Sequence, residues 1–305
     1  MTPVALTVEA LRMHYGTTAA LHDVTFQVRQ GETVCLLGPN GAGKTTTIEI
    51  LEGFRSRSAG RVEVLGADPA TADDHWRARV GIVLQSWRDH GKWRVRELLA
   101  QLGSYYGRYS DDVARRPWDA DELLAAVGLG ELANREVRLL SGGERRRLDV
   151  AVGIVGRPEV LFLDEPTAGF DPEARSEFHA LLHGLAAEGR TTILLTTHDL
   201  VEAEKLADRI VILDTGRIVA DGTAAELAQR IAGADTVRWT YGGRRFAEST
   251  SDSTRFAFEL FKQHGDAVAD LEVRRASLED AYLAIVHQAE SAATPSAATR
   301  EGAVR

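Results

Sequence analysis

The segment TVCLLGPNGAGKTTTIEIL, residues 33–51, decides the fold class of this 305-residue chain. It joins a short apolar run to a glycine-rich loop and then to a stretch of helical character. The loop fits the pattern G-x-x-x-x-G-K-[ST], with Gly38, Gly43, Lys44 and Thr45 at the fixed positions. A loop of this kind between a buried strand and a helix predicts a phosphate-binding site, because its glycines let consecutive backbone N–H groups turn toward phosphate oxygens.

The residue types of this loop have separate physical roles. A helix that begins near Lys44 points its positive dipole end at a bound anion. We expect the lysine ammonium to reach the β and γ phosphates, and the Thr45 hydroxyl to bind Mg²⁺. The alternative, a glycine-rich turn that binds nothing, does not explain why strand, helix, lysine and threonine occur together. The predicted nucleotide-binding residues of the loop are Gly38, Pro39, Asn40, Gly41, Ala42, Gly43, Lys44, Thr45 and Thr46.

The composition of the chain favours ATP over a guanine nucleotide. Guanine specificity usually needs an Asn-Lys-x-Asp element, and neither Asn40 nor Asn134, the two asparagines of the chain, fits one. We therefore expect ATP and Mg²⁺ as the cofactors.

The hydrophobic pattern on both sides of the loop predicts an α/β fold. The runs ALTVEAL, HDVTFQV and GRVEVLG in the first third alternate with period two, as half-exposed strands do. The runs TVCLLG, EVLFLDE and TTILLTTHD are short and continuously apolar, which is typical of strands buried on both faces of a parallel sheet. We expect a mostly parallel sheet covered by helices, with an antiparallel β portion near the N-terminus.

Three segments depart from this pattern. Residues 86–157 are mostly helical and are predicted to form an inserted helical subdomain. Residues 223–290 change character again and indicate a small appended α+β domain. Residues 291–305 are rich in Ala, Ser, Thr and Pro, so we expect a disordered tail.

Charge and cysteine content restrict the class of function. The net charge of −9 argues against binding nucleic acid through bulk charge, and no nucleic-acid partner is expected. The single cysteine, Cys35, excludes an internal disulfide and a multi-cysteine zinc site. No apolar run approaches the roughly 20 residues that span a bilayer. We expect a cytosolic chain, so any membrane-spanning part would come from another polypeptide.

Two adjacent carboxylates end the buried run VLFLDE. Asp164 and Glu165 are expected at the strand edge where ligands of open α/β sheets bind. Neighbouring strand residues point to opposite sides, so Asp164 is predicted to hold Mg²⁺ and Glu165 to orient or deprotonate the attacking water. The alternative is an acidic pair that only caps a strand in solvent. His198 ends a third buried run on the same edge, and a histidine alone is more often structural than catalytic.

The motifs now resemble a known family. LSGGE, residues 140–144, followed by LFLDEPTAGFDP, residues 161–172, is similar to the signature and Walker B regions of ABC-type ATPases. The resemblance covers roughly residues 4–222. Its elements occur in the family's order: Tyr15, the phosphate loop, Gln85, the signature, Walker B, Asp171 and His198.

The resemblance implies a head-to-tail dimer of two copies with ATP sandwiched between them. Ser141, Gly142 and Gly143, in the signature with Glu144, would face the γ-phosphate of the partner's ATP. Tyr15 would stack on adenine, and Asp171 would help to join the two sites. The implied catalytic residues are Lys44, Gln85, Glu165 and His198, and the implied Mg²⁺ residues are Thr45, Gln85 and Asp164.

Three details qualify the resemblance. Glu144 stands where the family often has Gln, and the loop before Asp171 reads Ala-Gly-Phe, but neither change removes a proposed ligand. The run Arg145 to Arg147 is interpreted as a solvated or interface-facing helix stretch. Trp87 and Trp93 are either docking-surface residues or core residues.

The C-terminal motif RRASLEDAYLAIV, residues 274–286, resembles the appended domain of multidrug-resistance ABC ATPases of the daunorubicin/doxorubicin exporter type. This implies an ATP-hydrolysing subunit at the cytoplasmic face of the cell membrane that drives export of a drug, lipid or other hydrophobic compound through a separate permease. One alternative is a soluble ABC-type ATPase acting on ribosomes or DNA, and a second is an ABC subunit for a non-drug substrate. Another is a P-loop kinase, which would leave the signature unexplained.

Overall fold

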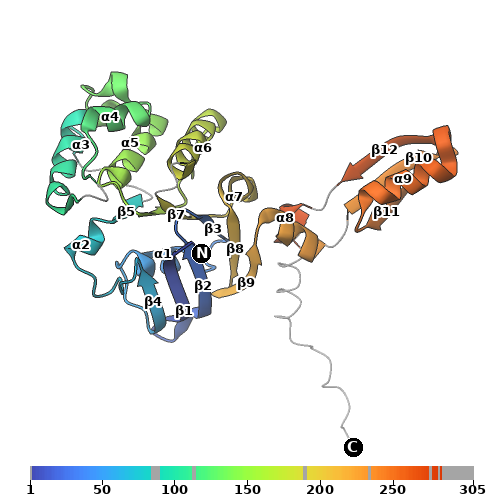
Figure 1. Ribbon diagram of the computed structural model, residues 1–305, viewed down its shortest axis with the longest axis horizontal. Coiled ribbons are helices and arrows are strands. Elements are labelled where there is room, and N and C mark those ends of the chain that lie inside the picture. Colours follow the sequence, from blue (N-terminus) through green and yellow to red (C-terminus); the bar gives the residue numbers. More distant parts are fainter. Residues whose placement is uncertain are drawn as a thin grey trace, which may run out of the picture. The chain divides into compact units, whose positions relative to one another are not determined.

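The computed structural model describes residues 2–83, 90–111, 115–187, 191–232, 235–274, 277–280 and 282–283. The chain divides into two compact units, Met1–Asp221 and Gly222–Arg305, which are coloured blue to yellow and orange to red in Figure 1. The expected site residue Gln85 and the expected tail 291–305 lie outside the described residues.

A six-stranded sheet forms the centre of the first unit. Its order is β5-β6-β7-β3-β8-β9, and the first five of these strands pair in parallel. Every residue of β3 is buried, because helices and the second sheet cover both faces. The strands are β3 (Thr33–Leu37), β5 (Val80–Val83), β6 (Val160–Asp164), β7 (Thr192–Thr197), β8 (Arg209–Asp214) and β9 (Arg217–Gly222).

An antiparallel sheet of order β2-β1-β4 lies beside the central sheet (Figure 1). Its strands are β1 (Val4–Tyr15), β2 (Thr18–Arg29) and β4 (Ala59–Val64). Alternate residues such as Leu6, Val8 and Phe26 share one core cluster with Leu36 of β3 and Ile48 of the first helix. The period-two pattern of the sequence thus puts one face of this sheet into the core.

Helices cover the central sheet and form a separate group at one end of the first unit. Figure 1 shows α3, α4 and α5 together in that group. The described parts of residues 90–157 contain helices and turns and no strand. The α-helices of this unit are α1 (Lys44–Leu51), α2 (Asp74–Arg77), α3 (Val95–Ser104), α4 (Ala120–Ala126), α5 (Gly142–Ile154), α6 (Pro172–Ala187) and α7 (Leu200–Leu206). The 3₁₀ turns are η1 (Gly107–Tyr109), η2 (Gly130–Leu132) and η3 (Val137–Leu139).

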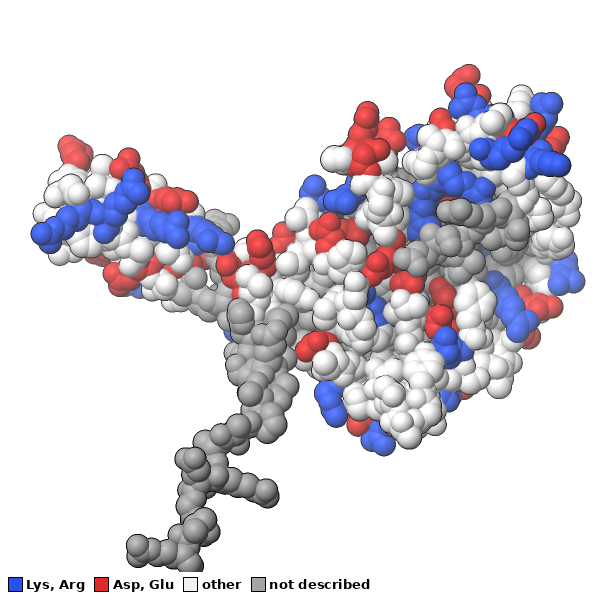
Figure 2. Space-filling view, turned by 180° about the vertical axis from the view of Figure 1, so that it is seen from behind, with Lys and Arg blue, Asp and Glu red and all other residues white. Residues whose placement is uncertain are grey.

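The second unit is a small α+β structure. Its sheet has the order β11-β10-β12, and Trp239 of β10 stacks on Phe246 of β11. The four arginines of these strands are all exposed, and Figure 2 shows basic side chains in a row on the visible face of this unit. The elements are α8 (Ala224–Leu227), the π-turn η4 (Ala228–Ala232), β10 (Asp235–Tyr241), β11 (Arg244–Thr250), α9 (Ser253–His264), η5 (Gly265–Ala267) and β12 (Val268–Arg274).

The predicted fold class is confirmed: a mostly parallel sheet, an antiparallel N-terminal sheet and helices on both sides. The strands β5, β8 and β9 and the individual strands of the second unit were not singled out from the sequence. Across the described parts of the chain, no helix is both long and apolar enough to span a bilayer.

Candidate active site

The order of the central sheet brings three chain segments to one edge. β7 lies between β6 and β3, with Asp164 opposite Thr196 and Leu37 opposite Thr197. All three strands run in the same direction, so the residues that follow them lie together at the carboxyl edge. The phosphate loop, Glu165 and His198 are therefore neighbours in space.

Two glycines of the loop are required by the packing of the backbone. A Cβ on Gly38 would lie 2.1 Å from the carbonyl oxygen of Leu213 in β8. Gly43 has φ +102° and caps α1, and a Cβ there would lie 2.6 Å from Leu21 Cδ2. A side chain is excluded at Gly38 by backbone, and at Gly43 it would be strained by the left-handed φ and would displace Leu21, so the curl of the loop depends on glycine.

Lys44 is held inside this curl. Its side chain is 5% exposed, and Nζ donates hydrogen bonds to the carbonyl oxygens of Gly38 at 2.7 Å and Pro39 at 3.1 Å. Nζ also lies 3.5 Å from Glu165 Oε1. The ammonium is thus fixed where the loop N–H groups and the α1 dipole favour an anion.

Glu165 Oε1 lies between two groups that can carry positive charge. His198 Nδ1 is 3.4 Å from it, and Lys44 Nζ is 3.5 Å from it. The carboxylate is partly open to solvent, with 19% of the side chain exposed, and the His198 side chain is 57% exposed. A carboxylate in this position has the access and the neighbours that a general base for a water molecule needs.

The backbone of Glu165 is strained. Its φ is +42°, a left-handed value that side-chain-bearing residues seldom adopt. Its N–H lies 3.2 Å from the carbonyl oxygen of Thr196 and 3.0 Å from the Thr196 hydroxyl. Strain of this kind clusters at functional sites and persists only where neighbouring contacts enforce it.

Asp164 faces two hydroxyls. Thr45 Oγ1 donates to Asp164 Oδ2 at 3.1 Å, and Thr196 Oγ1 donates to Oδ1 at 2.5 Å. A hydroxyl and a carboxylate on adjacent elements form the hard oxygen set that Mg²⁺ prefers. The residues present therefore fit this ion, and Thr45 with Asp164 would hold it.

Tyr15 lies at the outer side of the loop. Its hydroxyl is 3.2 Å from Thr46 Oγ1, and its ring is 43% exposed. The guanidinium of Arg55 lies over the ring, 5.0 Å from the centroid. Arg55 was not predicted, because nothing in its local sequence distinguishes it from a surface cation.

The signature residues begin helix α5. Ser141 is the N-cap: its hydroxyl accepts a hydrogen bond from the Glu144 N–H at 3.3 Å, and Glu144 Oε2 accepts one from the Ser141 N–H at 2.7 Å. These bonds lower the pKa of Glu144 below its usual value. Because Glu and Gln both complete such a capping box, Glu144 in place of Gln keeps the helix start intact.

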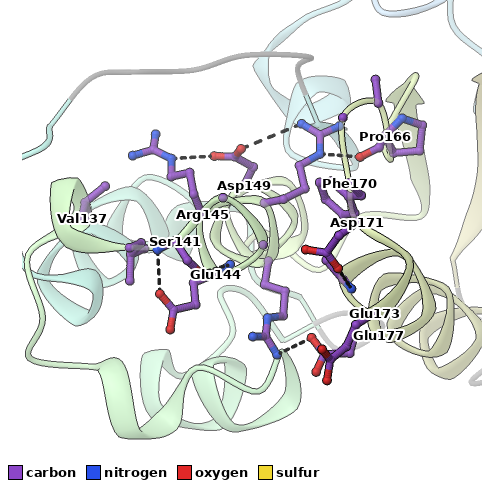
Figure 3. A pocket seen from close by; sticks show the side chains of 18 of the residues that line it. Val137, Ser141, Glu144, Arg145, Asp149, Pro166, Phe170, Asp171, Glu173 and Glu177 are labelled. Atoms are coloured by element: carbon purple, nitrogen blue, oxygen red, sulfur yellow. Dashed lines mark hydrogen bonds and ion pairs between the residues drawn. The ribbon is translucent and has the colours of Figure 1, made fainter.

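A cavity of about 1050 Å³ lies beside the signature. Figure 3 shows Ser141 and Glu144 on one side of it and Asp171 and Glu173 at the start of α6 on the other. Asp171 Oδ1 accepts a hydrogen bond from the Ala174 N–H at 2.9 Å. Glu165 also lines the cavity, but no residue of the phosphate loop 38–46, which the structure describes completely, does so.

The site residues therefore form two groups. Lys44, Thr45, Asp164, Glu165 and His198 lie together around the phosphate loop. The signature and Asp171 form a second group around the cavity of Figure 3.

The interpretation of Arg145 to Arg147 as a solvated or interface-facing helix stretch is wrong for Arg146. Arg146 is 6% exposed, and its Nε donates to the carbonyl oxygen of Pro166 at 2.8 Å. Arg145 Nε lies 3.2 Å from Asp149, and Arg147 lies 3.3 Å from Glu177 of α6. Burial against the loop after β6 explains the difference, and that loop is far away in the sequence.

Trp87 and Trp93 were predicted to be either docking-surface or core residues. Trp93 is 38% exposed and tilts against His90. Trp87 lies outside the described residues.

Sequence comparisons agree with these motifs. A model of the family described as ABC transporter matches residues 21–168. A Nod factor export ATP-binding protein I of Ralstonia nicotianae is 41% identical over 79% of this chain and 73% of its own length. A daunorubicin resistance ATP-binding protein of Streptomyces coeruleorubidus is 42% identical over 76% and 72%. A cobalt import ATP-binding protein of Rhodobacter capsulatus is 41% identical over 74% and 80%.

Solved structures give the same result. An ATP-binding subunit of an ABC transporter aligns with a TM-score of 0.67 and 25% identity, over 92% of this chain and 99% of its own. A dimeric ATP-binding cassette in a post-hydrolysis state, bound to ADP and phosphate, aligns with a TM-score of 0.62 and 25% identity, over 72% and 98%.

Proposed function

Because the chain belongs to the ABC transporter family of ATP-binding proteins, we propose that its ATP hydrolysis is catalysed at the cluster of Lys44, Glu165 and His198. The observation behind this proposal is the position of Glu165 Oε1, 3.5 Å from Lys44 Nζ and 3.4 Å from His198 Nδ1. Lys44 binds the β and γ phosphates, and His198 contacts the γ-phosphate. Glu165 orients the attacking water and accepts its proton.

The remaining residues bind and orient the nucleotide. Thr45 and Asp164 hold Mg²⁺, which would supply charge neutralisation at the phosphates. Backbone N–H groups of residues 38–46 surround the phosphates, and Tyr15 offers its ring to adenine. From the family resemblance, Gln85 is proposed to contact Mg²⁺ or the attacking water.

The signature serves the nucleotide of a second copy of this chain. Ser141 and Gly142 are exposed, and the cavity beside them has no phosphate-loop residue of its own chain. A head-to-tail dimer supplies that missing element from the partner. ABC cassettes dimerise, and the aligned post-hydrolysis cassette is itself a dimer.

The transported compound is proposed from the relatives. The Nod factor and daunorubicin resistance proteins favour export of a drug, lipid or other hydrophobic compound through a separate permease. This chain would then act at the cytoplasmic face of the membrane, bound to that permease. The cobalt import protein has a comparable sequence identity to this chain, so a non-drug substrate is the second candidate.

A mixing experiment tests the shared site. Lys44→Ala removes the cation of the phosphate loop, and Ser141→Arg places a bulky cation at the signature. Each variant alone should lose ATPase activity. A mixture forms heterodimers in which one site combines an intact loop with an intact signature, so activity should reappear. If the mixture stays inactive while the two variants form heterodimers, each chain completes its own site and the dimer proposal is wrong.

The transport proposal needs a different measurement. The membrane permease that this chain serves should co-purify with it, and inside-out vesicles containing both should accumulate a fluorescent anthracycline in an ATP-dependent manner. ATP-dependent loss of cobalt from preloaded inside-out vesicles, without anthracycline accumulation, would favour the second candidate.

A further inference from the structure

Two buried side chains of opposite charge hold the two residues that follow Glu165. We propose that Arg146 and Glu202 form a clamp on Pro166 and Thr167 that positions the Glu165 carboxylate for catalysis. The clamp rests on the proposed role of Glu165, and its members act through that residue without touching the nucleotide.

The first arm of the clamp comes from the signature helix. Arg146 lies in α5, five residues after the N-cap Ser141, and is 6% exposed. Its Nε donates to the carbonyl oxygen of Pro166 at 2.8 Å, and Asp149 lies 3.9 Å from its Nη1. A charge-assisted bond to a backbone carbonyl in a buried setting is strong and directional.

The second arm comes from the helix that follows His198. Glu202 lies in α7 and is 2% exposed, and its Oε1 accepts a hydrogen bond from Thr167 Oγ1 at 2.7 Å. Thr167 is 4% exposed. His179 of α6 lies behind the carboxylate, with Nε2 3.6 Å from the same oxygen. A buried carboxylate must be compensated by polar neighbours, and these two groups supply part of that compensation.

The clamp explains how Glu165 keeps its left-handed backbone. On the preceding side, the Glu165 N–H is fixed by the carbonyl and hydroxyl oxygens of Thr196 in β7. On the following side, the carbonyl of Pro166 and the side chain of Thr167 are fixed by the two arms. A disfavoured φ of +42° needs restraint of this kind from both directions. Without it, Glu165 relaxes and its carboxylate moves away from Lys44 and His198.

The clamp also joins the two groups of site residues. Arg146 and Ser141 belong to one helix, and Glu202 follows the N-cap Asp199, the neighbour of His198. A movement of the signature helix is therefore transmitted to the residue after Glu165 through one hydrogen bond. We infer that engagement of the signature by a partner and the placement of the carboxylate are mechanically linked.

The test removes one hydroxyl. Thr167→Val keeps the shape of the side chain and deletes the bond to Glu202, whereas Thr167→Ser retains the hydroxyl. We expect Thr167→Val to lower the kcat of ATP hydrolysis by roughly tenfold to a hundredfold, with KM for ATP changed by less than about twofold. Thr167→Ser should recover most of the kcat. Equal kcat in the parent and Thr167→Val, or equal losses in both variants, would overturn the clamp.

A second pair of variants guards against a simple folding defect. Glu202→Met removes the acceptor, and Glu204→Met makes the same change at an exposed position of α7. The first should reduce kcat and the second should not. The double variant Thr167→Val with Glu202→Met should be no slower than the slower single variant, because both lose the same bond. Multiplied losses would show that the two residues act separately and would contradict the clamp.

Failure of the clamp and failure of the proposed function would give different kinetic results. Glu165→Gln is measured in parallel. If it retains the parental kcat, Glu165 is not the catalytic carboxylate and the proposed function of that residue fails. If Glu165→Gln is inactive while Thr167→Val and Glu202→Met are fully active, only the clamp fails.

Discussion

The centre around Glu165 and the cavity beside Ser141 differ in how much of a site one chain supplies. At the centre, Glu165 Oε1 lies 3.5 Å from the Lys44 ammonium and 3.4 Å from Nδ1 of the His198 ring. Beside Ser141, the signature and Asp171 line about 1050 Å³ without any phosphate-loop residue. The residues of the first region are brought together by folding alone, whereas the dimer proposal assigns the second region to the phosphate of a partner's nucleotide. Substitutions in the two regions should therefore fail in different ways.

The largest effect is expected at the centre. Glu165→Gln removes the proton acceptor while keeping the size of the side chain, so ATP turnover should fall by roughly 10²–10⁴-fold. ATP affinity measured by equilibrium binding should stay within about threefold of the parent. Light scattering should then report a stable dimer with ATP, since the nucleotide is not consumed. Unchanged turnover would remove Glu165 from the centre.

The next effect is a pH dependence of folding stability that comes from Glu52. Burial, followed by the nearby charges of Asp164 and Glu49, raises the pKa of Glu52 at the end of α1 to about 8. A carboxyl whose folded pKa exceeds its unfolded value binds more protons when folded, so stability falls as pH rises from about 4.5 to about 8. Glu52→Gln should remove this loss, on the order of a few kcal/mol. Chemical denaturation of parent and variant at pH 5 and pH 9 measures it.

The pH dependence of stability that comes from Glu144, in the signature, should have the opposite sign to that from Glu52. The pKa of Glu144 is lowered by its bonds to Ser141, so its contribution to stability is present above the unfolded pKa and is lost as pH falls below it. The side chain keeps 21% of its surface exposed, and a partly solvated bond of this type contributes less than about 1 kcal/mol. Glu144→Gln should therefore change stability at pH 7 only slightly, and a large change would contradict the capping geometry.

A matched pair of glycines gives a smaller effect on folding. Gly43→Ala introduces a left-handed alanine against Leu21 and should destabilise the chain by about 1–3 kcal/mol. Gly142→Ala meets no atom within 4 Å in the first turn of α5 and should instead stabilise it by about 0.4–1 kcal/mol. Thermal unfolding measures both. If Gly142→Ala nevertheless lowers dimer ATPase activity, the space it fills is used by the partner's nucleotide.

The sequence was sufficient for the parts of the molecule that depend on local pattern. Continuous apolar runs predicted β3, β6 and β7, and the glycine spacing predicted the loop whose packing excludes a Cβ at Gly38. β5 was overlooked because four residues, Val80 to Val83, give too short a run to separate from a helical segment. The adjacent placement of Lys44, Glu165 and His198 follows from the strand order, which the motif order along the chain suggested only through family resemblance.

The clamp could not be predicted in the same way. Arg146 stands in a run of three arginines, and a charge run on a helix is normally solvated. Its buried partner, the carbonyl of Pro166, lies 20 residues away and has no side-chain signature. Glu202 likewise is one of two acidic residues in α7, and nothing in the local sequence distinguishes it from Glu204. Only tertiary packing shows that both are buried on neighbouring residues of one loop.

The confinement of Lys44 has a consequence for the desolvation cost of the proposed nucleotide binding. Its ammonium has 5% exposure and two carbonyl oxygens within 3.1 Å, so it loses its hydration shell when the chain folds. When a polyphosphate binds next to this cation, only the water around the polyphosphate still has to be removed. Under the proposed role of Lys44, the folded chain has already met part of the desolvation cost of binding the phosphates.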